Sequence, residues 1–148
     1  MIQFVSVLLK TIFVHGRDFQ WEKPSRCPRC GHWKVWGHGY VQALFDGFDE
    51  PLWLKRYRCP NCGCVIQMRP ASHFSRFQSS KATIRFALNH RIIQMRWPPG
   101  SHPARMRHWL ANLKRQTKAH LTETWKAGLM AGYDKLLETG FIPVSRSI

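Results

Sequence analysis

The chain has 148 residues and a formal net charge of +15 at pH 7, with 23 Lys and Arg against 8 Asp and Glu. This length leaves room for one ordinary domain or two small ones and excludes an assembly of several large domains. A charge this positive favours a polyanionic partner, with nucleic acid ahead of an anionic membrane surface.

The first element is expected in residues 2–14, which are rich in Ile, Phe and Val and predict one or two β-strands. This apolar segment contains Lys10 and is too short to span a bilayer. The five cysteines have spacings typical of free thiols, which indicates a reducing compartment. We therefore expect a cytoplasmic protein, associated with the nucleoid if the chain is bacterial.

Two short turns share one pattern, CPRCG at residues 27–31 and CPNCG at residues 59–63. The Cys-x-x-Cys spacing lets two thiolates reach one metal ion, and the glycine lets the backbone turn beneath it. The alternative interpretation is two disulfides or unligated thiols. Paired turns in such a compartment more often bind metal. The sequence therefore predicts a closed tetrahedral Zn²⁺ site formed by Cys27, Cys30, Cys59 and Cys62.

Three nearby residues are alternative ligands. Cys64 lies two positions beyond Cys62, where it either replaces that ligand or remains a free, half-buried thiol. His32 or His38 can join a mixed site, although four cysteines already satisfy one zinc ion.

Three strands are predicted around the turns, at residues 32–41, 52–58 and 65–68. Gly37 and Gly39 indicate a bulge or a close backbone approach in the first strand, and Pro70 ends the last. The order of turn, strand, loop, strand, turn and strand is that of a small antiparallel zinc ribbon. We place it with the N-terminal strands in a domain of residues 1–70.

A helical segment is predicted at residues 79–140, after a short basic linker. Ser79 or Ser80 can cap a first helix that runs to about Met95, before a Trp-Pro-Pro-Gly stop. A second helix is expected over about 103–118, with an apolar stripe formed by Met106, Trp109, Leu110 and Leu113.

A third helix is expected over 121–138, and residues 141–148 are interpreted as a tail. The apolar stripe of this helix is formed by Leu121, Trp125, Leu129, Tyr133 and Leu136. Gly128 and Gly132 within it either weaken the helix or mark close contact with a neighbouring helix. The expected fold is therefore α+β: a four-cysteine ribbon followed by a three-helix, helix-turn-helix-like segment.

Residues 51–122 contain no Asp or Glu. A solvated surface normally mixes both signs, so a one-signed surface indicates an anionic partner. We expect nucleic-acid contacts from the ribbon and from the second helix. The candidate residues are Lys55, Arg56, Arg58, Arg105, Arg107, Lys114, Arg115 and Lys118.

The order of these parts resembles the N-terminal region of insertion-sequence transposases, in which a four-cysteine ribbon precedes a helix-turn-helix-like DNA-binding segment. The resemblance covers about residues 26–118 and rests on both cysteine turns, on GHGY at 37–40 and on RYR at 56–58. The chain is too short for the catalytic domain of such transposases, and its acidic residues show no pattern for two-metal chemistry. The resemblance therefore implies a non-enzymatic relative: an accessory protein, a regulator or a decayed fragment.

We therefore expect a zinc-dependent protein that binds duplex DNA in preference to RNA, with a transposase or another protein as a further partner and no membrane. Two other functions remain open. RNA binding is favoured if the strand aromatics stack on bases, namely Trp36, Tyr40, Trp53 and Tyr57. A protein-docking adaptor is favoured if no nucleic acid binds at moderate salt.

Overall fold

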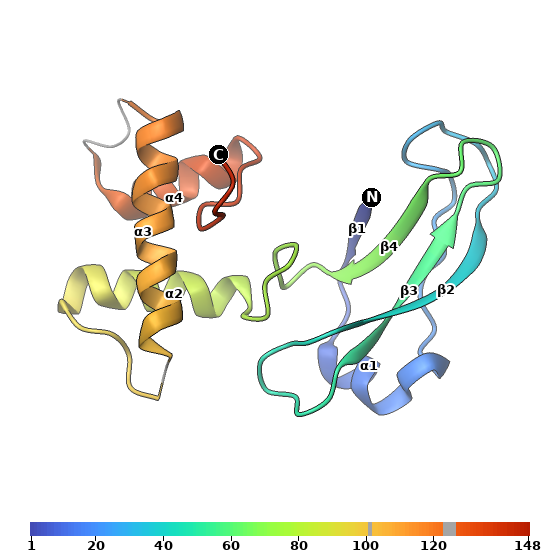
Figure 1. Ribbon diagram of the computed structural model, residues 1–148, viewed down its shortest axis with the longest axis horizontal. Coiled ribbons are helices and arrows are strands. Elements are labelled where there is room, and N and C mark those ends of the chain that lie inside the picture. The colour runs from blue at the N-terminus through green and yellow to red at the C-terminus, as the bar shows by residue number, and fades with distance from the viewer. Residues whose placement is uncertain (101, 123–126) are drawn as a thin grey trace. The chain divides into compact units, whose positions relative to one another are not determined.

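The computed structural model describes residues 1–100, 102–122 and 127–148 (Figure 1). The chain divides into two compact units, which are Met1–Ser80 and Lys81–Ile148. The first unit contains a four-stranded sheet and the second contains helices, so the fold is α+β. In the described ranges, no helix is both long and apolar enough to cross a membrane.

The sheet of the first unit has the strand order β1-β4-β3-β2. Its strands are β1 (Ile2–Val5), β2 (Trp36–Ala43), β3 (Leu52–Arg58) and β4 (Val65–Pro70). The pairs β2–β3 and β3–β4 are antiparallel, as expected, but β1 pairs parallel to β4. The sheet is therefore mixed. Parallel pairing needs a long connection, and the chain between β1 and β4 is long enough to bring β4 back in the direction of β1.

A helix stands where part of the N-terminal strand region was expected. After β1 the chain forms α1 (Leu9–His15) and the short 3-10 helix η1 (Gly16–Asp18). Ile12 of α1 is fully buried in the core of the first unit, whereas its neighbours Phe13 and Val14 are exposed. A helix of seven residues can place Ile12 in the core and leave its neighbours in solvent. Packing therefore overrides the strand preference of these residues.

The β2–β3 hairpin contains the expected bulge, because its register shifts between Gly37 and Tyr40. Gly39 has φ +74°, a conformation that residues with a Cβ rarely adopt. Residues paired across strands point to the same face of a sheet. Tyr57 pairs with Ile66 on one face, while Leu52 and Leu54 are buried on the other, so the core covers both faces.

Residues 71–78, expected as a linker, are held to the sheet by hydrogen bonds from Arg69. The guanidinium of Arg69 is buried and donates to the carbonyls of Phe74 (3.1 Å) and Phe77 (2.7 Å). It also lies over the ring of Phe45, 5.1 Å from the centroid. Burial lowers the pKa of Arg69, but its contacts give it a structural role in place of a surface one.

The described residues of the second unit form α2 (Lys81–Gln94), α3 (Pro103–His120) and α4 (Leu129–Glu138). The first two helices agree with the expected ranges within a few residues. The predicted stripe of α3 faces the core, since Met106, Trp109 and Leu113 are buried and Leu110 is half-buried. In Figure 1, α3 packs against both α2 and α4.

The third helix begins later than predicted. Leu121 and Thr122 are not helical, and α4 starts at Leu129, after Gly128 with φ +109°. Trp125, which was expected on the apolar stripe, lies outside the described residues. The predicted helix therefore does not run unbroken into α4, because the backbone at Gly128 has a conformation that no α-helix contains.

The segment 141–148 packs on α3, although it was interpreted as a tail. Val144 is buried, and its carbonyl accepts a hydrogen bond from the side chain of Asn112 (3.1 Å). Gln116 donates to the carbonyls of Ser145 (3.0 Å) and Ser147 (2.5 Å). Two buried amide side chains of α3 thus satisfy the backbone of this irregular segment.

Candidate metal centre and basic surfaces

The two cysteine turns fold alike. In the first turn, the N–H of Gly31 donates to the carbonyl of Cys27, and in the second the N–H of Gly63 donates to that of Cys59, both at 2.9 Å. The two glycines have φ +74° and +72°, which is the left-handed region that a Cβ disfavours. The repeated CPxCG pattern therefore specifies one backbone turn twice.

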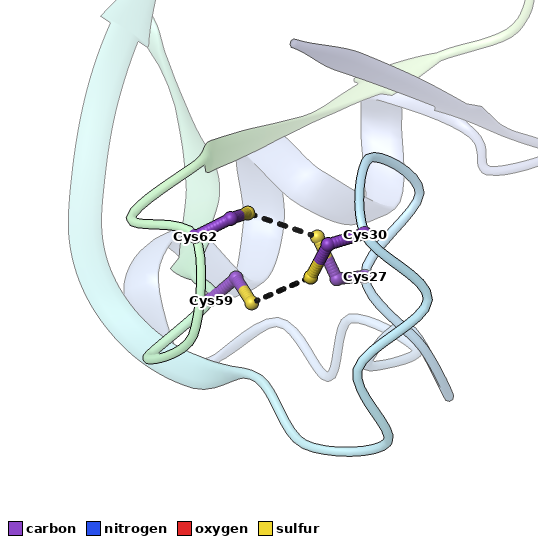
Figure 2. Close-up of side chains that lie close together, drawn as sticks. All are labelled: Cys27, Cys30, Cys59 and Cys62. Carbon is purple, nitrogen blue, oxygen red and sulfur yellow. Dashed lines mark hydrogen bonds between the residues drawn. The ribbon is translucent and has the colours of Figure 1, made fainter.

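These turns point four sulfur atoms at one another, as Figure 2 shows. The Sγ atoms of Cys27 and Cys62 are 3.6 Å apart, and those of Cys30 and Cys59 are 3.5 Å apart. All four lie within 4.8 Å of one another. A tetrahedral ion with metal–sulfur bonds of about 2.3 Å requires sulfur–sulfur distances of about 3.8 Å. The group could therefore hold one metal ion with only small movements.

The surroundings of the four thiols are uneven. Cys27 and Cys59 are buried in the same core as Trp21 and Val35, whereas Cys30 is exposed. The backbone N–H of Arg29 donates to Cys27 Sγ (3.4 Å), and the side chain of Asn61 donates to Cys30 Sγ (3.6 Å). Donors to sulfur stabilise thiolates, which are the form that binds metal.

The thiols cannot all ionise without a cation. Hydrogen bonds from the N–H of His32 and from Asn61 lower the pKa of Cys30 to about 6, and the N–H of Cys30 lowers that of Cys27. The N–H of Cys64 also favours the Cys62 thiolate, but burial and the other three thiols outweigh it and raise the pKa of Cys62 to about 12. A divalent ion reverses this penalty, because it neutralises the repulsion between neighbouring thiolates.

The alternative ligands lie outside this group. It contains Cys27, Cys30, Cys59 and Cys62, and neither Cys64 nor a histidine belongs to it. Cys64 is buried, and its thiol faces the carbonyl of Val65 at 3.7 Å. It is therefore a core residue on the strand side of the second turn.

The three ribbon cations lie on opposite faces of β3. By the alternation of the strand, Lys55 shares a face with Tyr57, and its ammonium lies 4.5 Å from the Tyr40 ring centroid. Arg56 and Arg58 point to the other face, where Arg58 is exposed and Arg56 half-buried. The structure therefore does not gather these three candidates into one surface.

The five candidates on the second predicted helix all lie on α3, in the other unit. Four of them are exposed on the side opposite the buried stripe, whereas Arg105 is half-buried. Ala111 continues the same exposed side, so the surface follows helical spacing. We call it the α3 basic face, and it consists of Arg107, Lys114, Arg115 and Lys118.

A hollow of about 380 Å³ lies between the start of β2 and the second turn. It is lined by Trp36, Gly37, His38, Arg58, Cys59, Pro60 and Gly63. No sequence pattern predicts this hollow. Its position depends on the register that pairs Trp36 with Arg58, and this register depends on the bulge.

The fold and the cysteine group together define an α+β chain with a candidate four-cysteine metal centre. Comparison with protein-family models, with curated proteins and with solved structures gives no match.

Proposed function

We propose that this chain is a zinc-dependent protein that binds duplex DNA through the α3 basic face. The observation that supports the proposal is the exposure of four cations on one side of an 18-residue helix that contains no acidic residue. The opposite side of α3 is buried, so the helix presents its basic side to solvent. Cations held on a helix can neutralise phosphates along a groove.

The major groove of B-DNA admits an α-helix, and the N-terminal residues of such a helix meet base edges first. Arg105 lies in the first turn of α3, which makes it our candidate for base contacts. Residues 95–102 connect α2 to α3, and this connection is longer than the turn of a helix-turn-helix motif. The proposal therefore needs α3 in the groove but not the standard position of the preceding helix.

Zinc is the ion that best suits the cysteine group. Four thiolates in a closed tetrahedral arrangement are typical of structural zinc, which has no open position for chemistry. The ion would join the first turn, which lies in a segment without regular structure, to the second turn between β3 and β4. Its role would be to stabilise the fold of the first unit.

The α3 basic face is tested by the double substitution Lys114→Ala and Lys118→Ala. Each neutralised phosphate contributes about 0.9 to the slope of log affinity against log salt, so the slope should fall by about 1.8 on every duplex sequence. Fluorescence anisotropy with labelled duplexes over a salt series measures this slope. The matched control is Lys135→Ala, which removes an exposed lysine of α4 that already pairs with Glu138 at 3.4 Å.

The proposal is refuted if the double variant keeps the wild-type slope, or if Lys135→Ala reduces it to the same extent. Binding that is lost on duplexes but kept on another protein would instead favour the docking adaptor. A role as an accessory protein or regulator of a transposase is a further proposal, which rests on the resemblance of the cysteine turns and helices alone.

A further inference from the structure

The hollow beside the second cysteine turn lies wholly within the first unit and is separate from the α3 basic face. One wall is the indole of Trp36, and the opposite strand supplies Arg58. These two residues pair directly across β2 and β3, so their side chains project from the same face of the sheet. The aromatic ring of Trp36 and the guanidinium of Arg58 therefore belong to the lining of one hollow.

Trp36 is not used by the core. Its side chain is 55% exposed, whereas Trp21 and Trp109 are buried. Exposing an indole forgoes the free energy of burying one of the largest apolar surfaces in the chain. Its neighbour Lys34 extends over the ring, with Nζ 5.6 Å from the centroid. The exposed ring is therefore held next to the positive charge of Lys34.

The segments around the hollow carry no acidic side chain. Residues 23–45 and 51–122 contain no Asp or Glu, and these ranges include both strands and the second turn. Cys59, which also lines the hollow, is itself fully buried. Charge thus favours an anionic ligand, and the indole favours one with a flat ring.

We propose that this hollow binds one unpaired nucleotide, with its base stacked on Trp36 and its phosphate on Arg58. Bases in a duplex have both faces covered by their neighbours, so only an unstacked base can use an exposed indole. A guanidinium holds a phosphate by two parallel hydrogen bonds. The inference extends the proposed nucleic-acid function to a second site, on the other unit, for single strands. DNA and RNA strands share the required chemistry.

The test is the affinity of Trp36→Ala for oligothymidine, oligouridine and a duplex of equal length, by fluorescence anisotropy. Loss of one stacked base should weaken single-strand binding by roughly 5- to 150-fold. Duplex affinity, zinc content and the circular dichroism spectrum should stay unchanged. Trp36→Phe keeps a ring and should restore part of the loss, and Arg58→Ala should lower the single-strand salt slope by about 0.7.

Trp33→Ala is the matched control, because Trp33 is 69% exposed and lies near Lys34 as well, but does not line the hollow. The inference is overturned if Trp36→Ala and Trp33→Ala bind single strands alike, or if the wild type binds no single strand. If Trp36→Ala unfolds, the single-strand affinities of Trp36→Phe and Arg58→Ala test the inference instead. Wild-type single-strand affinity in both variants overturns it. A wild-type protein that binds single strands but no duplex would refute only the proposal for the α3 basic face. The tighter of the two oligonucleotides identifies the source of the nucleotide.

Discussion

Gly132 of α4 lies against α3 so closely that a single methyl group should destabilise the second unit. A Cβ at this position would stand 2.6 Å from Cγ2 of Thr117, and real Cβ atoms do not approach so near. Thr117 is fully buried, and its hydroxyl donates to the carbonyls of Leu113 (2.9 Å) and Lys114 (3.0 Å). The methyl group of Thr117 therefore cannot rotate away without losing these hydrogen bonds.

Two opposing effects set the magnitude for Gly132→Ala. Alanine gains about 1 kcal/mol over glycine inside a helix, while overpacking a filled core costs about 1–3 kcal/mol. Because Thr117 is held in place, we expect overpacking in the upper part of this range, about 2–3 kcal/mol, so the variant should lose about 1–2 kcal/mol. Urea titration followed by circular dichroism at 222 nm measures this loss, since most helical residues belong to α2, α3 and α4.

The control removes only the clashing atom. Thr117→Ser deletes Cγ2 and keeps the hydroxyl, after which the nearest atoms to the new Cβ are Thr117 Cβ at 3.7 Å and Leu121 Cδ1 at 3.9 Å. In that background Gly132→Ala should be neutral or stabilising, which gives a coupling energy of about 1–3 kcal/mol. Equal losses in both backgrounds, or a more stable single variant, would show that this contact does not limit the packing of α3 on α4.

The remaining predictions concern the cysteine group. Metal analysis of the purified protein should find about one equivalent of zinc. Cys64→Ser should retain the zinc, and Cys62→Ser should lose it. The opposite result would make Cys64 the ligand in place of Cys62. Zinc affinity, measured by competition with a chromophoric chelator, should fall as the pH falls, because at neutral pH Cys62 must lose a proton to bind and its pKa is about 12 without metal. The fall should steepen below about pH 6, where Cys30 is protonated as well, and an affinity that does not change with pH would contradict thiolate ligation.

The cysteine turns could be predicted from sequence because their information is local. A Cys-x-x-Cys-Gly turn needs only its own hydrogen bonds and one glycine of positive φ, and both copies have them. The strand Leu52–Arg58 and the buried side of α3 were also predictable, since alternation and helical spacing report burial directly. The exposed cations of α3 follow from the same spacing.

What could not be predicted depends on contacts distant in the chain. Residues 9–15 have strand-forming composition, but they form α1, whose Ile12 is buried in the core and whose Leu9 packs against it. The segment 141–148 looks like a tail because its anchors are Asn112 and Gln116, two polar residues whose partners lie about thirty positions away. One local signal existed, since both amides flank the apolar stripe of α3 at a spacing of four residues.

The parallel pairing of β1 with β4 has a consequence for the synthesis of the protein. Ile2 pairs with Gln67, so β1 has no partner until the ribosome has added the intervening chain, which takes roughly 3–13 s at about 5–20 residues per second. The first cysteine turn waits about half as long for the second, because 32 positions separate Cys27 from Cys59. During this interval the apolar residues of β1 and α1 are uncovered, which makes the nascent chain prone to aggregation. We therefore expect the first unit to fold late and in one step, when β4 emerges and closes both the sheet and the cysteine group.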